Sequence, residues 1–135
     1  MKVLGLIALA LLAGAGWVRG APSDPVRWHR MPEPLPEAKG PGHVVERLPG
    51  RAAEMAELDR LIRDTPRTQV LAGSVAEGMV TYVTRSKWMG FPDYTTVARR
   101  GDDLVIFARL RFGKSDFGVN AARVGQWRER LGQGG

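Results

Sequence analysis

The residues best suited to binding an anion gather between Arg109 and Arg123. Alternation in the apolar stretch Asp103–Phe112 predicts a strand in which Arg109 and Arg111 share one face, roughly 7 Å apart. Because each guanidinium offers a planar fork of donors, the pair could form part of a cradle for an anion. The opposite face carries small and aliphatic side chains that should pack under helices, namely Leu104, Ile106, Ala108, Leu110 and Phe112.

A glycine-containing connection follows that strand and should lead into a helix. Lys114 would add a positive charge, and a helix N-terminus with serine and lysine nearby can hold a phosphate or carboxylate. Asp116 and Asn120 are also good helix-capping residues, and capping is the simpler role for them. Ser115 and Arg123 complete the polar set, which we interpret as residues that lock the loop.

A second polar block runs from Thr84 to Tyr94 and should turn between two strands. Arg85 could join Arg109 and Arg111 in the anion site if the strand register agrees. The alternative is that Asp93, Asp116 or backbone carbonyls hold each arginine in place, since exposed arginine pairs on sheets are usually minor energetically. In the same block, Trp88, Met89 and Phe91 could form an apolar tip for a membrane or a protein partner.

Together the two blocks resemble the signature of the family called domain of unknown function 1499. Its members carry an R-S-x-x-x-G-F-x-D block, then a strand pair, then S-R-x-G-x-S-D-x-G-x-N. The similarity covers roughly Arg51 to Leu131 of this sequence. It implies that the protein is exported or associated with a membrane, and the family supplies no activity.

The sequence offers little support for a catalytic function. There is no cysteine, which excludes disulfides and thiolate chemistry, and the expected folded unit lacks histidine because His29 and His43 precede it. The carboxylates are scattered, so we expect no metal and no cofactor. An enzyme built on Asp93, Asp116 and Ser115 is a third hypothesis, although aspartates amid arginines should stay ionised. No nucleic-acid-binding motif is present.

The N-terminus has the pattern of an export segment. A basic start precedes an apolar run over residues 3–18, so residues 1–20 are expected to be a signal peptide or an uncleaved membrane anchor. The protein would then lie in the periplasm or on the periplasmic face of the inner membrane. Seven of nine prolines fall between Pro22 and Pro49, which predicts an extended spacer over residues 21–50. Trp28 and His29 could still dock on the folded unit.

Residues 51–135 are expected to form one small α+β domain. Helical periodicity begins at Arg51 and ends before Thr65-Pro66, and a final helix is expected from about Asn120 to Leu131. Between them lie four predicted strands of a single antiparallel sheet, the last two joined as a hairpin by the turn at residues 100–103. The strands are Thr68–Ser74, Gly78–Ser86, Tyr94–Arg100 and Asp103–Phe112.

The positive charge lies mainly in the half of the chain that carries both blocks. The net charge is +6, and residues 81–130 hold 10 basic against 5 acidic residues, a balance of +5. We therefore expect a non-enzymatic module that binds an anionic group or lipid headgroup through Arg85, Arg109, Arg111 and Lys114. The alternative is a structural protein that contacts an envelope partner through the Trp88–Phe91 loop.

Overall fold

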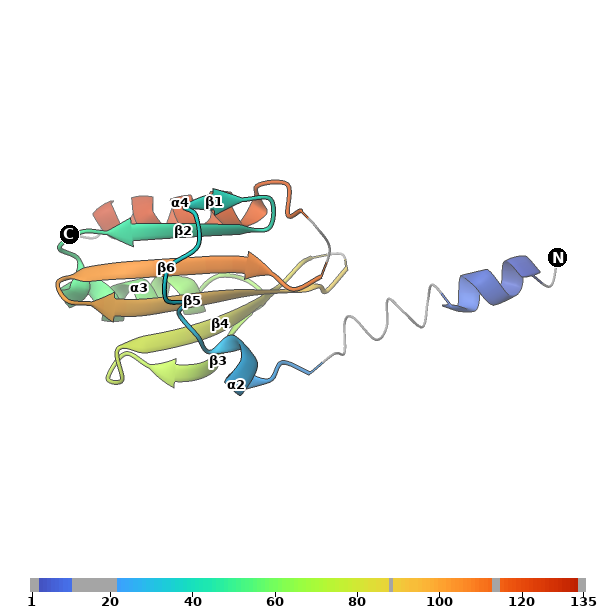
Figure 1. The fold of residues 1–135 in the computed structure, drawn as a ribbon, viewed down its shortest axis with the longest axis horizontal. Coiled ribbons are helices and arrows are strands. Elements are labelled where there is room, and N and C mark those ends of the chain that lie inside the picture. Colours follow the sequence, from blue (N-terminus) through green and yellow to red (C-terminus); the bar gives the residue numbers. More distant parts are fainter. Residues whose placement is uncertain (1–2, 11–21, 88, 113–114, 134–135) are drawn as a thin grey trace.

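The fold is an α+β arrangement around one antiparallel sheet (Figure 1). The computed structural model describes residues 3–10, 22–87, 89–112 and 115–133. Six strands lie in the order β1-β2-β6-β5-β4-β3, so the sheet is larger than the four strands expected. The α+β class and the single antiparallel sheet agree with the sequence analysis.

The four expected strands are present with small shifts at their ends. They are β3 (Thr68–Ser74), β4 (Met79–Arg85), β5 (Pro92–Arg100) and β6 (Asp103–Leu110). The predicted hairpin is confirmed, because Arg100 pairs with Asp103 across the turn between β5 and β6. β-branched residues make up four of the seven residues of β4 and the centre of β5, Thr95 to Val97, where both strands are largely buried.

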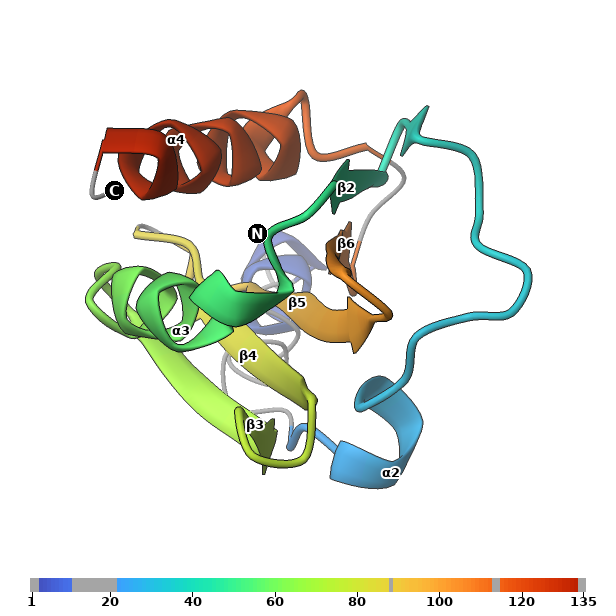
Figure 2. The ribbon, with the colours of Figure 1, turned by 90° about the vertical axis from the view of Figure 1, so that its left-hand side faces the viewer.

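Two helices cover one face of the sheet (Figure 2). A short 3-10 turn, η1 (Ala52–Glu54), leads into α3 (Met55–Arg63), and α4 (Val119–Gln133) closes the chain. Their apolar stripes pack on the strand residues expected to face them, including Leu104, Ile106 and Ala108. Two hydrogen bonds fix the helices, from Tyr82 to Asp59 of α3 at 2.5 Å and from Trp127 of α4 to Thr65 at 2.9 Å.

The expectation of an extended spacer over residues 21–50 is wrong for much of that segment. It contains a short helix, α2 (Pro25–Trp28), and two strands, β1 (Lys39–Gly40) and β2 (His43–Leu48). β2 pairs with β6 along its full length, so the folded unit begins well before Arg51. Prolines flank these strands instead of interrupting them, which explains how a proline-rich segment can still join a sheet.

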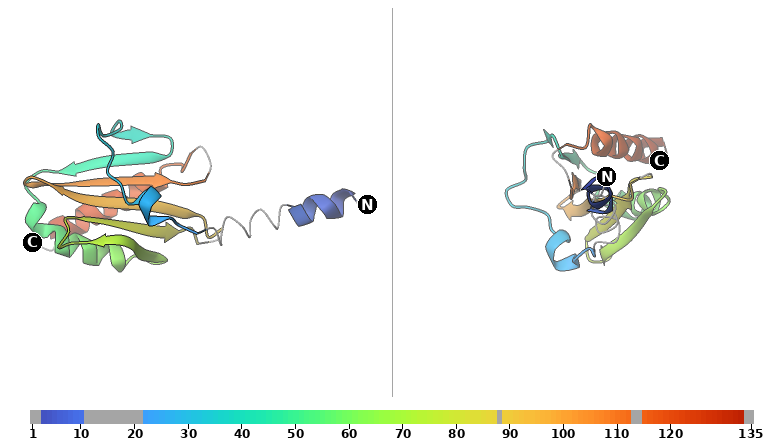
Figure 3. Two further views of the ribbon diagram at one scale, coloured as in Figure 1. Left: turned by 60° about the horizontal axis from the view of Figure 1, so that its bottom comes forward. Right: turned by 90° about the vertical axis from the view of Figure 1, so that its right-hand side faces the viewer.

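Residues 22–38, called the strap here, cross the face of the sheet opposite α3 and α4 (Figures 2 and 3). Met31 of the strap is buried against Ala98 and Val105, and Leu35 packs at the edge of this second, smaller apolar cluster. His29 Nδ1 lies 2.8 Å from the Thr81 hydroxyl. Gly73 allows this approach, because a Cβ there would lie 2.6 Å from the His29 ring. Both faces of the sheet are therefore covered.

All the loops that carry the two polar blocks meet at one end of the sheet. β4 and β6 end there and β5 begins there, so residues 86–87 and 89–91 lie near residues 111–112 and 115–118 (Figure 1). The connection from α3 to β3, residues 64–67, reaches the same end because Thr68 pairs with Thr84. We call this the motif end. The turns at residues 49–51, 75–78 and 101–102 form the opposite end.

Candidate functional site: the cavity between the two polar blocks

Arg109 and Arg111 lie on the face of β6 that the sequence predicted, but the strap covers that face. Arg109 is 8% exposed. Its guanidinium donates to the Thr96 hydroxyl at 2.8 Å, to the Phe107 carbonyl at 3.1 Å and to the carbonyl of Trp28 in the strap. Burial lowers the pKa of Arg109 to about 10, which leaves it charged at neutral pH.

Arg111 is bound to the start of the strap in the same manner. It donates to the Pro22 carbonyl at 2.8 Å and to the Tyr94 hydroxyl at 3.0 Å. Trp28 stacks on the Tyr94 ring with centroids 4.0 Å apart and completes the layer over both arginines. The expected open basic face is therefore closed by the chain itself, since backbone carbonyls occupy the donors that an anion would use.

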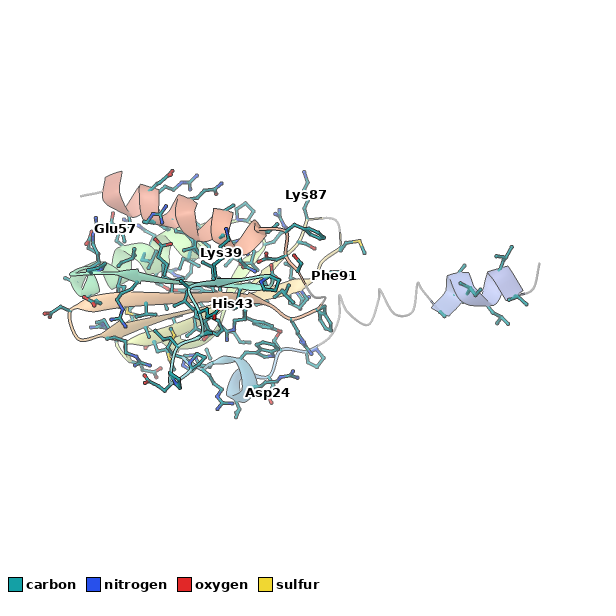
Figure 4. All side chains as sticks on the ribbon, turned by 45° about the horizontal axis from the view of Figure 1, so that its top comes forward. Asp24, Lys39, His43, Glu57, Lys87 and Phe91 are labelled. Atoms are coloured by element: carbon teal, nitrogen blue, oxygen red, sulfur yellow. The ribbon has the colours of Figure 1, made fainter. Side chains whose placement is uncertain are left out.

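Arg85 has a different setting, at the end of β4. Its Nη1 donates to the Gly90 carbonyl at 2.9 Å, across the loop that follows. The Ser86 hydroxyl accepts from the Phe91 N–H at 3.0 Å, and the backbone of Ser86 closes the same loop through Gly90 and Phe91. These bonds hold the guanidinium of Arg85 at the mouth of the motif end, where Lys87 and Phe91 also lie (Figure 4).

Arg67 is a site residue that the sequence analysis missed. Its Nε donates to the Arg85 carbonyl at 3.0 Å, and its own carbonyl accepts from the Arg85 N–H at 3.0 Å. Arg67 has a positive φ of 58°, an unusual conformation that brings the chain from α3 into β3. The position just after Thr65-Pro66 was the available signal, but only the pairing of β3 with β4 sets Arg67 beside Arg85.

The loop before α4 is organised by Asp116. Its carboxylate accepts from the backbone N–H groups of Gly118 at 2.8 Å and Asn120 at 3.3 Å, so it caps the first turn of the helix. The buried Asn120 side chain donates to Asp116 at 2.9 Å and accepts from Arg123 at 3.1 Å. The Ser115 hydroxyl accepts from the Phe117 N–H at 3.2 Å.

Asp93 connects this loop to β5. It lies 3.7 Å from Arg123 as an ion pair, with both side chains largely buried. The pKa of Asp93 is raised to about 6, mainly by burial, which outweighs the lowering effect of Arg123 and is reinforced by the nearby Asp116. The expectation that both aspartates simply stay ionised is therefore too simple for Asp93, because desolvation outweighs its cationic partner.

A cavity of about 410 Å³ lies between the two blocks. Its charged lining consists of four cations, Arg67, Arg85, Lys87 and Arg123, and two carboxylates, Asp93 and Asp116. With both carboxylates ionised the lining carries a net charge of +2 (four minus two). A second cavity, of about 550 Å³, adjoins the first. Four residues line both cavities, namely Arg67, Arg85, Ser86 and Lys87.

The predicted site residues thus divide into two groups. Arg85 lines the cavity with Asp93, Ser115, Asp116 and Arg123, whereas neither Arg109 nor Arg111 lines it. Lys114 and Trp88 fall outside the described residues. The predicted convergence of three arginines is replaced by a cluster centred on Arg67 and Arg85.

Both histidines lie within the folded unit, which corrects the premise that they precede it. His43 of β2 lines a small cavity of about 230 Å³ together with Ser115 and Asp116. However, His43 Nε2 lies 2.8 Å from the Glu37 carbonyl, and Ser115 bonds to its own loop, so their polar atoms are engaged elsewhere. No group of three or more metal-ligating side chains occurs among the described residues.

The comparisons with known proteins agree with the two polar blocks. Residues 21–131 match the family described as "Protein of unknown function (DUF1499)". The chain belongs to this family. The match includes the strap and β2, in agreement with their packing on the sheet. No curated protein matches the sequence significantly.

Proposed function

We propose that this protein is a binding module for a phosphate- or carboxylate-bearing group, and that the group binds in the cavity at the motif end. The observation that carries the proposal is the set of four cations around one cavity of about 410 Å³, opposed by two carboxylates. The site differs from the sheet face expected from the sequence, because the strap occupies that face.

The hydrogen bonds within the loops favour a binding site over a surface whose cations merely face solvent. Arg67 and Arg85 hold one another through their backbones, and Arg85 is oriented by Gly90. Since these side chains are positioned before any ligand arrives, little conformational entropy is lost on binding. Asp116 does not compete with an anion, because backbone and side-chain N–H groups already surround its carboxylate.

The cellular location of the protein is proposed from the sequence alone. An export segment at residues 1–20 would place the binding module in the periplasm or on the periplasmic face of the inner membrane. Among the parts of the chain that the structure describes, no helix is both long and apolar enough to cross a membrane.

Thermal unfolding of the full chain in neutral detergent tests the proposal. Inorganic phosphate, acetate and a short-chain phosphatidylglycerol are the probes, so that a free anion and a lipid headgroup are compared. A probe at 100 times its Kd adds about 2.7 kcal/mol, a rise in Tm of roughly 10–15 °C.

The variants make the thermal measurement specific to the cavity. Arg85→Gln and Arg67→Gln should each abolish most of the rise in Tm, whereas Arg60→Gln, an exposed change on α3, should retain it. The proposal fails if no probe raises Tm, or if the rise persists unchanged in Arg85→Gln.

A further inference from the structure

The motif end differs from the opposite end of the sheet in its exposed apolar side chains. Phe117 is 92% exposed, and Val119 and Met89 are about half exposed. Phe117 lies in a turn with positive φ, followed by Gly118, which also has positive φ, and it projects from the loop instead of packing beneath it. Among the described residues, the turns at the opposite end carry no large exposed hydrophobic side chain.

The same end carries the cations of the cavity. Arg67, Arg85 and Lys87 line it beside Met89 and Phe117. An aromatic ring that projects beside several cations is the combination found where proteins lie on anionic bilayers, because the ring enters the interface while the cations meet headgroups. An apolar surface without those charges would fit a protein partner equally well.

The chain also enters the folded unit at this end. Pro22 is bound by Arg111 at the end of β6, and the Ser23 hydroxyl lies 2.7 Å from that of Tyr94. Upstream, residues 3–10 form a helix whose large apolar side chains are all more than half exposed, namely Val3, Leu4, Leu6, Ile7 and Leu9. An apolar helix that precedes this entry point would tether the motif end, and not the opposite end, to a bilayer.

We propose that the motif end is a membrane-contacting surface that recognises anionic lipid headgroups. Phe117 enters the interfacial region, Met89 and Val119 border it, and Arg67, Arg85 and Lys87 face the headgroup phosphates. This inference rests on the proposed anion site and names its ligand as part of a lipid bilayer. The opposite end then faces away from the membrane.

Polarity-sensitive labels can determine which end contacts lipid. The chain has no cysteine, so Phe117→Cys and Asp102→Cys each provide a single attachment site, at the motif end and at the opposite end. Each labelled full chain is mixed with vesicles of phosphatidylcholine, with or without phosphatidylglycerol, and with spin-labelled lipid as quencher. On vesicles with phosphatidylglycerol, the label at 117 should be quenched and that at 102 should not.

Partitioning of unlabelled variants onto vesicles measures how much each side chain contributes to membrane binding. Phe117→Ser should weaken binding to phosphatidylglycerol vesicles about tenfold, whereas Val26→Ser, which changes an equally exposed residue of the strap, should not. Lys87→Gln should weaken binding about fivefold on these vesicles and leave binding to phosphatidylcholine unchanged.

The outcomes separate this inference from the proposed function. If the label at 117 stays in water on phosphatidylglycerol vesicles while inorganic phosphate still raises Tm through Arg85, the membrane surface is refuted and the anion site stands. Equal quenching with and without phosphatidylglycerol refutes the preference for anionic lipid. If phosphate, acetate and phosphatidylglycerol all fail to raise Tm, the anion site itself is refuted.

Discussion

Two groups of arginines in or next to the same sheet differ in what lies over them. Arg109 of β6 and Arg111 just after it are bound to the strap, and carbonyls and hydroxyls of the protein accept their hydrogen bonds. Arg67 and Arg85 line an open cavity at the motif end. The difference teaches that a basic pair on a strand is not by itself a binding site, because what covers the strand decides its role.

The covered group also explains how the strap is held. The apolar cluster beneath the strap is small, and the buried residue that the strap contributes to it is Met31. The main core under α3 and α4 is much larger. The stacking of Trp28 on Tyr94 and the bonds of Arg109 supply the rest. We therefore expect the covered arginines to control stability and the cavity arginines to control binding.

Arg109→Ala should give the largest loss of stability, about 3 kcal/mol, in urea denaturation. It removes a buried guanidinium that donates to the Thr96 hydroxyl and to the Phe107 and Trp28 carbonyls, and so breaks the side-chain link between β6 and the strap. Arg60→Ala is the control, an exposed arginine that should change stability by about 0.5 kcal/mol at most. Similar values for the two variants would contradict a structural role for Arg109.

Trp28→Ala should cost about 2 kcal/mol, because the ring is only partly buried. Limited proteolysis should then cut within residues 22–38 faster than in the parent protein. Val26→Ala lies in the same short helix but is 84% exposed, so its cleavage rate should match the parent. If Trp28→Ala leaves the strap as resistant as before, the aromatic stack does not hold it.

Asp93 should make stability depend on pH between about 4 and 6. Its folded pKa of about 6 lies above its ordinary value of 3.8, so the folded state binds the proton more tightly than the unfolded state. Stability from this group is full below pH 4 and is lost as pH rises through 6, a change on the order of 2 kcal/mol. Urea denaturation across this range measures it.

Asp93→Asn should remove that slope, while Glu129→Gln, on the exposed side of α4, should keep it. Anion binding should also strengthen below pH 6, because a neutral Asp93 raises the charge of the cavity lining from +2 to +3. An unchanged slope in Asp93→Asn would assign the pH dependence to another group.

Among these four residues, Arg85→Gln should have the smallest effect on stability, about 1 kcal/mol, because its hydrogen bond to the Gly90 carbonyl is only part-buried. Its effect on anion binding should nevertheless exceed that of Arg109→Lys, which retains the charge under the strap. Isothermal titration with inorganic phosphate measures both. A larger loss of affinity in Arg109→Lys would reverse the assignment of the two groups.

Local pattern was sufficient to predict β3 to β6, the helices α3 and α4, and the two faces of β6, but not β1, β2 or α2. Alternation put Arg109 with Phe107 and opposite Ile106, and the turn at residues 100–103 gave the β5–β6 hairpin. The strap was missed because proline content describes a local preference, whereas coverage of a sheet depends on contacts such as Trp28 with Tyr94 across 66 positions. Arg67 was missed for the same reason, since only β3–β4 pairing brings it to Arg85.

The most direct test of the central claim follows the arginine side chains themselves. In the full chain, the Nε–Hε resonances of Arg67, Arg85 and Arg109 can be assigned by substitution and followed by NMR during a titration with inorganic phosphate. The account predicts saturable shifts for Arg67 and Arg85 and none for Arg109. Shifts confined to Arg109, or no saturable shift in any of the three, would contradict it.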